Sequence, residues 1–132
     1  MEGRREARER ALELLYEAYA KDQSVPEVLV ALPVRPDEYT TELVRGVHAH
    51  RAELDERIGR NAKEGWSLAR MPVIDLALLR LAAYELEFEP DVPVGAVIDE
   101  AVSLAKQFST DEAGRFVNGV LAAIAAEVRP EP

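Results

Sequence analysis

Apolar residues recur along this chain at spacings of three and four, which is the pattern of an α-helix with one buried face. The first such segment, residues 3–21, ends where the sequence DQSVP introduces a proline. We therefore predict a helix over residues 3–21 and a short helical piece over residues 27–31. The apolar positions of the first helix are Ala7, Ala11, Leu14, Leu15 and Ala18.

A second helical pattern begins after Pro36, where Asp37 is a favourable N-cap residue. It predicts one long helix that ends between residues 59 and 65, followed by a short helical turn over residues 66–70. The apolar stripe of the long helix consists of Leu43, Val47, Leu54 and Ile58, with His50 or Arg51 in the gap.

The segment after Pro72 is apolar nearly all round. Residues 73–88 read VIDLALLRLAAYELEF, with few polar positions between the aliphatic ones. A helix without a polar face is a buried helix. We expect residues 73–88 to form the central helix of the fold.

Two more helices complete the pattern. Pro93 opens a helix over residues 93–108 with a regular apolar seam. Ser109 and Glu112 then have the spacing of a capping box, in which the serine oxygen reaches the N3 amide and the glutamate reaches back. We expect the last helix to start at Ser109.

The dipeptide Asn118-Gly119 lies within this last segment. Between apolar residues it is a strong hairpin signal, but the predicted cap places it two to three turns inside a helix. A glycine there costs about 0.5–1 kcal/mol relative to alanine. Either a ligand or backbone approaches closely at Gly119, or a neighbouring helix packs against it.

These elements predict an all-α fold of six or seven helices in a single domain, residues 1–132. The chain is 48% hydrophobic, which is enough for one compact core. Aromatic residues make up only 6%, so the core must consist mainly of Leu, Val, Ile and Ala. The pattern contains no strand, internal repeat or long linker.

The formal net charge of −9 argues against a nonspecific nucleic-acid binder but permits a local basic patch. The chain has no cysteine, which removes disulfides and thiolate chemistry. No apolar run approaches the roughly 20 residues of a membrane span. The charged start MEGRREARER is unlike a signal peptide. We expect a cytoplasmic protein without membrane contact.

Few residues suggest catalysis. His48 and His50 are two apart on one predicted helix, so they point to different sides and make a poor metal pair. A phosphate loop, G-x-S-x-G and H-E-x-x-H are all missing. The adjacent Asp111 and Glu112 suit a helix N-terminus, where negative charge is favourable. We predict that the protein is not an enzyme and uses neither a metal nor a cofactor.

Three arginines, Arg4, Arg5 and Arg8, cluster at the start of the first predicted helix. Positive charge there opposes the helix dipole, and guanidinium groups match phosphate geometry. Phosphate binding is one explanation, and Tyr16 could then offer a stacking face to an unpaired base. The alternative is a salt-bridged surface helix with a packed tyrosine. The neutralising carboxylates would be Glu2, Glu6 and Glu9.

With these residues assembled, the chain resembles the NusB family of bacterial transcription antitermination factors. The resemblance is carried by RREARERALELLYEAY at the start and by VIDLALLRLAAYELEFEPDVPVGAVIDEAVSLAKQFSTDEAGRFVNGVL near the end, within which DVPVGAVIDEAVSLAKQF and GRFVNGVL are the most specific pieces. Their order and spacing both fit the family, whereas residues 22–66 match only in helical character. The resemblance implies two packed helical subdomains, residues 1–65 and residues 66–132.

The resemblance also implies a function. Members of this family bind the single-stranded boxA element of ribosomal RNA transcripts together with the ribosomal protein NusE. The complex joins RNA polymerase and other Nus factors and suppresses premature termination. We therefore expect an RNA-binding antitermination factor.

The resemblance assigns RNA contacts to both ends of the chain. Asp75 and Glu112 match acidic family positions tied to partner or RNA affinity. Glu6 interrupts a run that is often more basic in the family, so we expect weak RNA binding unless the protein partner contributes charge. The RNA contacts that the resemblance implies are Arg4, Arg5, Arg8, Tyr16, Arg115, Phe116 and Asn118.

A second function suits the sequence as well. A protein-only helical adaptor, which meets basic proteins and never touches RNA, fits the net charge of −9 better than an RNA binder does. The sequence does not distinguish a monomer from a homodimer, and some relatives self-associate through the surface that RNA would use.

Overall fold

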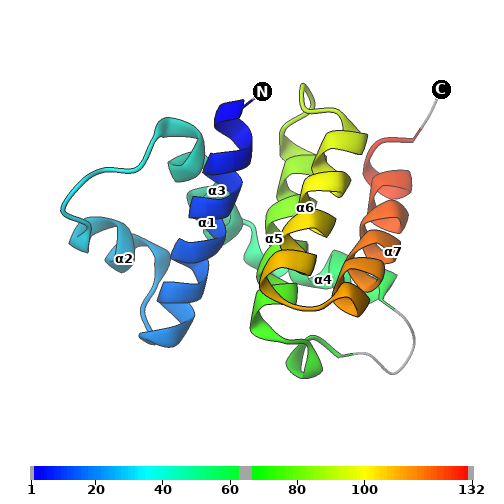
Figure 1. The fold of residues 1–132 in the computed structure, drawn as a ribbon, viewed down its shortest axis with the longest axis horizontal. Coiled ribbons are helices and arrows are strands. Elements are labelled where there is room, and N and C mark those ends of the chain that lie inside the picture. The colour runs from blue at the N-terminus through cyan, green and yellow to red at the C-terminus, as the bar shows by residue number, and fades with distance from the viewer. Residues whose placement is uncertain (1, 63–66, 131–132) are drawn as a thin grey trace.

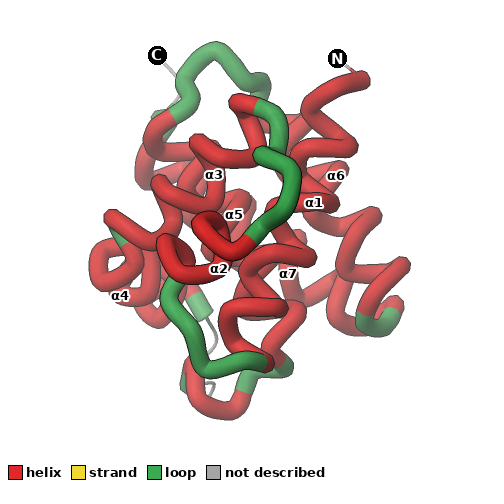
Figure 2. Tube along the Cα trace, turned by 90° about the vertical axis from the view of Figure 1, so that its left-hand side faces the viewer, coloured by secondary structure: helices red, strands yellow, loops and turns green. Residues whose placement is uncertain are grey.

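The computed structural model describes residues 2–62 and 67–130. Within these ranges the chain is helical and contains no strand (Figures 1 and 2), which confirms the predicted all-α class. The elements are α1 (Glu2–Ala20), α2 (Val25–Ala31), α3 (Glu38–Ala49), α4 (Arg51–Asn61), the 3-10 helix η1 (Leu68–Arg70), α5 (Val73–Phe88), α6 (Val94–Phe108) and α7 (Asp111–Val128).

The helices form two groups that meet along α5. One group consists of α1, α2 and α3, and the other of α5, α6 and α7 (Figure 1). Helix α5 also contacts α1, α3 and α4, so it touches both groups. Its buried residues extend from Asp75 to Leu86 and lie on every side of the helix. The central buried helix predicted over residues 73–88 is confirmed.

The single long helix predicted after Asp37 is wrong, because the chain turns at His50 and forms α3 and α4 instead. His50 adopts φ −109° and ψ 17°, although neither proline nor glycine lies at the break. Its ring stacks on Phe88 of α5, with the ring centroids 4.1 Å apart. The turn lets α4 pack against α5 and α7, so tertiary contacts override the local helical pattern.

An ion-pair cluster holds α4 to the second group of helices. The Arg57 guanidinium contacts Glu87 of α5 at 2.9 Å and Glu127 of α7 at 2.8 Å. Arg60 also reaches Glu127, at 3.2 Å. Helix α4 precedes residue 65 in the chain but packs mainly on α5 and α7, which follow it. The subdomain division at residue 65 therefore stays a prediction.

The last helix starts one residue later than predicted. Ser109 closes the final turn of α6, and Thr110 is the N-cap of α7, its hydroxyl accepting from the Ala113 N–H at 2.9 Å. The capping box predicted at Ser109 and Glu112 is therefore wrong. A complete capping box instead begins α2, where Ser24 and Glu27 exchange hydrogen bonds.

A buried ion-pair network joins the two groups of helices. Arg8 of α1 is 5% exposed, and its guanidinium donates to both oxygens of Glu85 of α5 at 2.7, 2.8 and 3.0 Å. It also donates to Glu100 of α6 at 2.7 Å, while the Tyr39 hydroxyl of α3 donates to Glu85 at 2.7 Å. Burial alone would lower the pKa of Arg8, but Glu85 and Glu100 outweigh it and raise the pKa. The Arg8 guanidinium therefore stays charged.

Replacing Arg8 by methionine should leave the buried carboxyl group of Glu85 without its main partner. We expect the variant to lose about 3–5 kcal/mol of unfolding free energy, because an uncompensated buried charge is strongly destabilising. Urea denaturation followed by circular dichroism measures this loss. The double variant Arg8→Met/Glu85→Leu removes both charges and should recover part of it. A double variant no more stable than Arg8→Met would contradict the assignment.

Candidate nucleic-acid interface

Arg4 and Arg5 lie in the first turns of α1, where the structure gives them no carboxylate partner among the described side chains. The Arg4 guanidinium lies over the ring of Tyr39, 5.2 Å from the ring centroid. Arg5 is exposed and donates to the Ser103 hydroxyl of α6 at 3.5 Å. Neither guanidinium forms an ion pair with a described carboxylate, although the charge of Arg4 also acts on Glu89, so both groups can still bind an anion.

The salt-bridged alternative for this end of α1 is not observed. Neither Glu6 nor Glu9 forms an ion pair with Arg4 or Arg5 in the described part of the chain, and the side chain of Glu2 lies outside it. Two cations near the positive end of a helix dipole reinforce its attraction for anions. The start of α1 is therefore a favourable site for a phosphate group.

Arg8 has a different environment from its two neighbours. It is buried, and its hydrogen bonds go to Glu85 and Glu100. A phosphate could reach this guanidinium only by displacing one of these carboxylates. The observed role of Arg8 is structural, and its predicted contact with RNA stays a prediction.

Tyr16 lies further along the same side of α1 as Arg5. Eleven residues at 100° each return to nearly the same face, roughly 16 Å along the helix. The Tyr16 side chain is 46% exposed and lies next to the more exposed Tyr19, with the ring centroids 6.4 Å apart. An aromatic face exposed to this extent is accessible to an unpaired base. Core packing is therefore not the role of Tyr16, and its contact with RNA stays a prediction.

The start of α7 presents the second set of predicted RNA contacts. Arg115 and Asn118 are exposed and lie one turn apart, so their side chains are neighbours on the helix surface. Phe116 is half-buried and packs against the core. Glu112 is exposed in the first turn. Asn118 and Gly119 lie inside α7, which confirms the helical interpretation of this dipeptide.

Gly119 has open space where a side chain would be. A Cβ atom built at this position would meet no atom of the described residues within 4 Å, and the residue is exposed. Packing of a described neighbouring helix therefore does not account for this glycine. The helical backbone of α7 is accessible there, beside Asn118, to a molecule that binds from outside.

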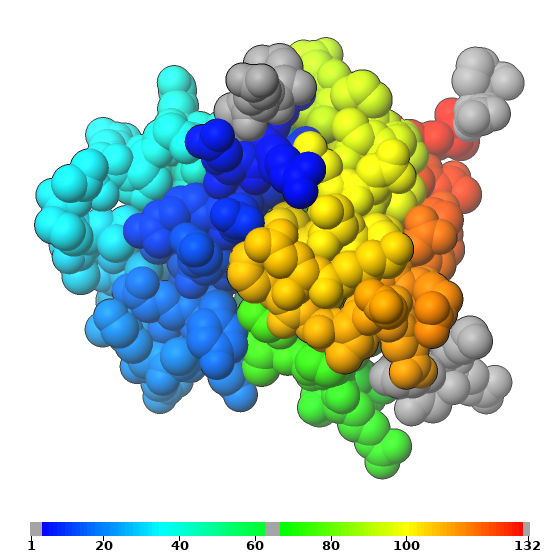
Figure 3. All heavy atoms as spheres, viewed as in Figure 1, coloured from blue at the N-terminus to red at the C-terminus, as the bar shows by residue number. Residues whose placement is uncertain are grey.

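Helix α6 lies between the two sets of predicted contacts. Figure 3 shows α1, α6 and α7 side by side on one face of the molecule. The Arg5 guanidinium reaches Ser103 across the boundary between α1 and α6, and α6 packs along α7. The three helices form one continuous surface.

The two acidic positions have contrasting environments. Asp75 is 4% exposed in the first turn of α5, and its Oδ1 atom has no hydrogen-bond partner in the described part of the chain. Negative charge is favourable at this end of a helix dipole. Glu112 is exposed on α7. The predicted role of both residues in partner binding stays a prediction, and a partner would reach Asp75 only after its neighbours move.

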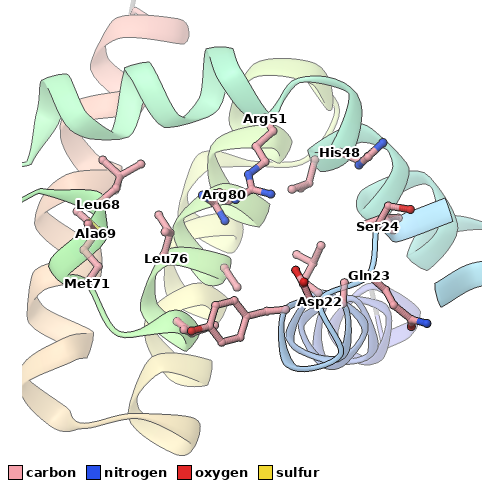
Figure 4. Close-up of a pocket in the computed structure, with 17 residues that line it drawn as sticks. Asp22, Gln23, Ser24, His48, Arg51, Leu68, Ala69, Met71, Leu76 and Arg80 are labelled. Atoms are coloured by element: carbon pink, nitrogen blue, oxygen red, sulfur yellow. The ribbon is translucent and has the colours of Figure 1, made fainter. Parts of the chain in front are cut away.

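A separate hollow of about 520 Å³ lies between the end of α1, the facing ends of α3 and α4, η1 and α5. His48, Arg51 and Arg80 line its polar side, and Figure 4 shows Leu76 and Met71 on its apolar side. None of the predicted RNA or partner contacts lines it. The candidate nucleic-acid interface is therefore not this hollow.

The two histidines lie in different environments. His48 is exposed, and His50 is half-buried against Phe88. The described residues contain no group of three or more His, Cys, Asp or Glu side chains that could hold a metal ion.

Among the helices that the structure describes, none is long and apolar enough to span a membrane.

The carboxyl of Glu89, at the end of α5, has an unusual proton affinity. Burial raises its pKa to about 7, together with a hydrogen bond to Glu42 and the negative charges of Glu42 and Glu85, while Arg4 opposes the shift. In the folded protein this group therefore takes up a proton near neutral pH. The charge of Arg4 therefore affects the protonation of Glu89, which is hydrogen-bonded to Glu42.

Replacing Glu89 by glutamine should change how stability depends on pH. A carboxyl whose pKa is raised by folding favours the folded state at low pH, and this contribution is lost as pH rises from about 4.5 to about 7. Glutamine does not ionise, so the variant should melt at a higher temperature than the parent at pH 8 and at a similar one at pH 4. Thermal unfolding at both pH values measures the difference. If the melting temperatures of the parent and the variant change equally between pH 4 and pH 8, the raised pKa of Glu89 is contradicted.

Replacing Gly119 by alanine should stabilise the fold. Alanine is favoured over glycine by about 0.5–1 kcal/mol inside a helix, and the new methyl group enters open space. Urea denaturation of the variant measures the gain. Gly95, another helical glycine with open space around it, gives a matched control as Gly95→Ala. Destabilisation of Gly119→Ala alone would show that α7 is constrained there.

Comparison with known sequences gives a match over nearly the whole chain. The model of the NusB family matches residues 5–126. A relative from Saccharopolyspora erythraea named transcription antitermination protein NusB is 48% identical over 131 residues, which cover 95% of this chain and 88% of the relative. A relative of the same name from Acidothermus cellulolyticus is 48% identical over 130 residues, covering 96% and 89%.

Solved structures also match the fold of this chain over nearly its whole length. T. maritima NusB is similar with a TM-score of 0.85 and 34% identity, over 96% of this chain and 93% of that one. A chain in a structure of antitermination factors NusB and NusE in complex with dsRNA gives a TM-score of 0.81 and 30% identity, over 96% and 98%. The family match, the identity and the shared fold lead to one conclusion: the chain belongs to the NusB family.

Proposed function

We propose that this protein is a transcription antitermination factor that binds a single-stranded, boxA-like RNA element together with NusE. The relatives that it matches carry the name of an antitermination protein. The observation that carries the proposal is the start of α1, where neither Arg4 nor Arg5 forms an ion pair with a described carboxylate and Arg5 reaches Ser103 of α6.

The charge distribution fits a specific rather than a general RNA binder. A body with a net charge of −9 repels a polyanion at long range, so it disfavours RNA that makes no local contact. The exposed cations Arg4, Arg5 and Arg115 supply local attraction, and Asn118 supplies a donor and an acceptor for a base edge. Few phosphate contacts imply a modest salt dependence.

Unpaired RNA suits this surface better than a duplex does. Tyr16 offers an exposed ring on the same side of α1 as Arg5, and stacking on an aromatic ring requires a base that is free of its own strand. The major groove of an RNA duplex is too narrow for side chains to read. We therefore assign single-stranded RNA to the face formed by α1, α6 and α7.

NusE is the protein partner in this proposal. The similar chain that was solved with NusE and dsRNA shares the fold over nearly its full length. A basic ribosomal protein would complement the acidic body of this chain and add cations beside a small basic patch. Asp75 and Glu112 are the proposed acidic contacts. RNA polymerase and other Nus factors would then join through the complex, in the cytoplasm and without catalysis by this chain.

The protein-only adaptor is the competing function, and the net charge favours it. It predicts that the complex with NusE forms equally well without RNA, and that the purified complex retains no RNA after nuclease treatment. The proposed function predicts that a single-stranded boxA oligonucleotide binds the complex more tightly than its duplex does. Equal and weak binding of both forms would favour the adaptor.

The double variant Arg4→Gln/Arg5→Gln should weaken RNA binding without changing the fold or the affinity for NusE. Each phosphate contact on a single strand contributes about 0.7 to the slope of log affinity against log salt, so the slope should become less steep by about 1.4. Fluorescence anisotropy with a labelled boxA oligonucleotide at several salt concentrations measures both quantities.

Arg10 provides the matched control for this experiment. It is exposed on the same helix, but its guanidinium is paired with Glu13 at 3.3 Å. Arg10→Gln should therefore leave RNA affinity and the salt slope unchanged. If the Arg4→Gln/Arg5→Gln variant binds RNA as the parent does, the start of α1 is not the RNA site.

A further inference from the structure

Resting on the proposed RNA-binding function, we propose that Lys106 of α6, lying over Gly114 of α7, is a further RNA-phosphate contact that connects the two sets of cations. The family motif near the end of the chain begins with Gly114, yet the contacts carried over by resemblance do not include it. Neither Lys106 nor Gly114 is among the residues that the sequence pattern singled out.

Gly114 provides the space that the lysine side chain occupies. The residue is buried, and a Cβ atom built on it would lie 2.9 Å from Cγ and 3.1 Å from Cε of Lys106. Any larger residue at position 114 would therefore push the aliphatic part of Lys106 away from α7. The glycine lets the lysine lie across the first turns of α7, immediately before Arg115.

The ammonium group of Lys106 has no ion-pair partner among the described residues. Four exposed cations elsewhere are paired with a described carboxylate whereas Arg35, Arg45 and Arg70 are not, so it is the position of Lys106, and not the missing partner alone, that matters. A cation in the last turn of α6 complements the helix dipole, but the dipole does not require the contact with Gly114. The paired cations are Arg10 with Glu13, Lys21 with Glu17, Arg51 with Asp55 and Arg60 with Glu127.

The position of Lys106 joins the two parts of the candidate interface. Ser103, which accepts the hydrogen bond from Arg5, lies three residues before Lys106, so both side chains share one face of α6. From there the lysine reaches α7 beside Arg115. Consecutive contacts thus run from α1 across α6 to α7, and Lys106 supplies the charge in the middle.

The neighbouring charges make this contribution necessary. Asp111 and Glu112 are exposed in the first turn of α7, directly before Gly114, and their negative charge opposes a phosphate at this end. Arg115 alone does not outweigh the two carboxylates. With Lys106 the cations and carboxylates at this corner balance, and a strand that leaves the α1 arginines meets no net repulsion.

The test compares Lys106→Gln with the parent protein, both in complex with NusE, in binding to a labelled single-stranded boxA oligonucleotide. We expect affinity to fall several-fold and the salt slope to become less steep by about 0.7, the contribution of one phosphate contact. Lys21→Gln is the matched control, because Lys21 is exposed at the far end of α1 and pairs with Glu17 at 3.1 Å. This control should bind RNA as the parent does.

A second variant tests the role of the glycine without removing charge. Gly114→Ala displaces a flexible side chain, so the fold should be kept while RNA affinity falls by less than in Lys106→Gln. Combined with Lys106→Gln, it should cause no additional loss, because the two changes act on one contact. If the losses of RNA affinity in the two single variants add up in the double variant, Gly114 does not position this lysine.

The outcomes separate this inference from the function on which it rests. If Arg4→Gln/Arg5→Gln weakens RNA binding while Lys106→Gln leaves affinity and slope unchanged, the role of Lys106 is overturned and the proposed function stands. If the parent complex fails to bind the oligonucleotide, the proposed function fails and the inference fails with it.

Discussion

The packing of this molecule depends on the buried contact between Arg8 and Glu85. The cost of removing both charges from water is offset only when their hydrogen bonds are nearly all made. Glu100 and Tyr39 complete the set, so that α1, α3, α5 and α6 must come together around one guanidinium and one carboxylate. The relative position of the two helical groups follows from this requirement as well as from the packing of the apolar core.

The same carboxylate organises part of the surface. Burial and the negative charge of Glu85 raise the pKa of Tyr39, so its phenol stays protonated and continues to donate. This hydrogen bond holds the ring of Tyr39 in place, and the Arg4 guanidinium lies over that ring. An interior hydrogen bond therefore holds a surface arginine of the proposed RNA site in place. The order of the proposed RNA face therefore depends on the order of the core.

Local patterns predicted most of the helices but not the break between α3 and α4 or the contacts between helices. The period of apolar residues indicated α5 correctly, because a buried helix shows its environment in its own sequence. The turn at His50 was missed, since only the distant Phe88 explains it. The burial of Arg8 was missed for the same reason, as its partners are far away in sequence. The contacts on α7 came from the family resemblance, and Lys106 required the geometry of Gly114.

The separation of Arg8 from its partners has a consequence for how the protein is made. Glu85 follows Arg8 by 77 residues and Glu100 follows it by 92. During synthesis the first helix leaves the ribosome long before either carboxylate exists, so its arginine must remain hydrated until most of the chain has emerged. Contacts of such long range form late and slowly. The nascent N-terminal half therefore cannot reach its final packing until translation is nearly finished.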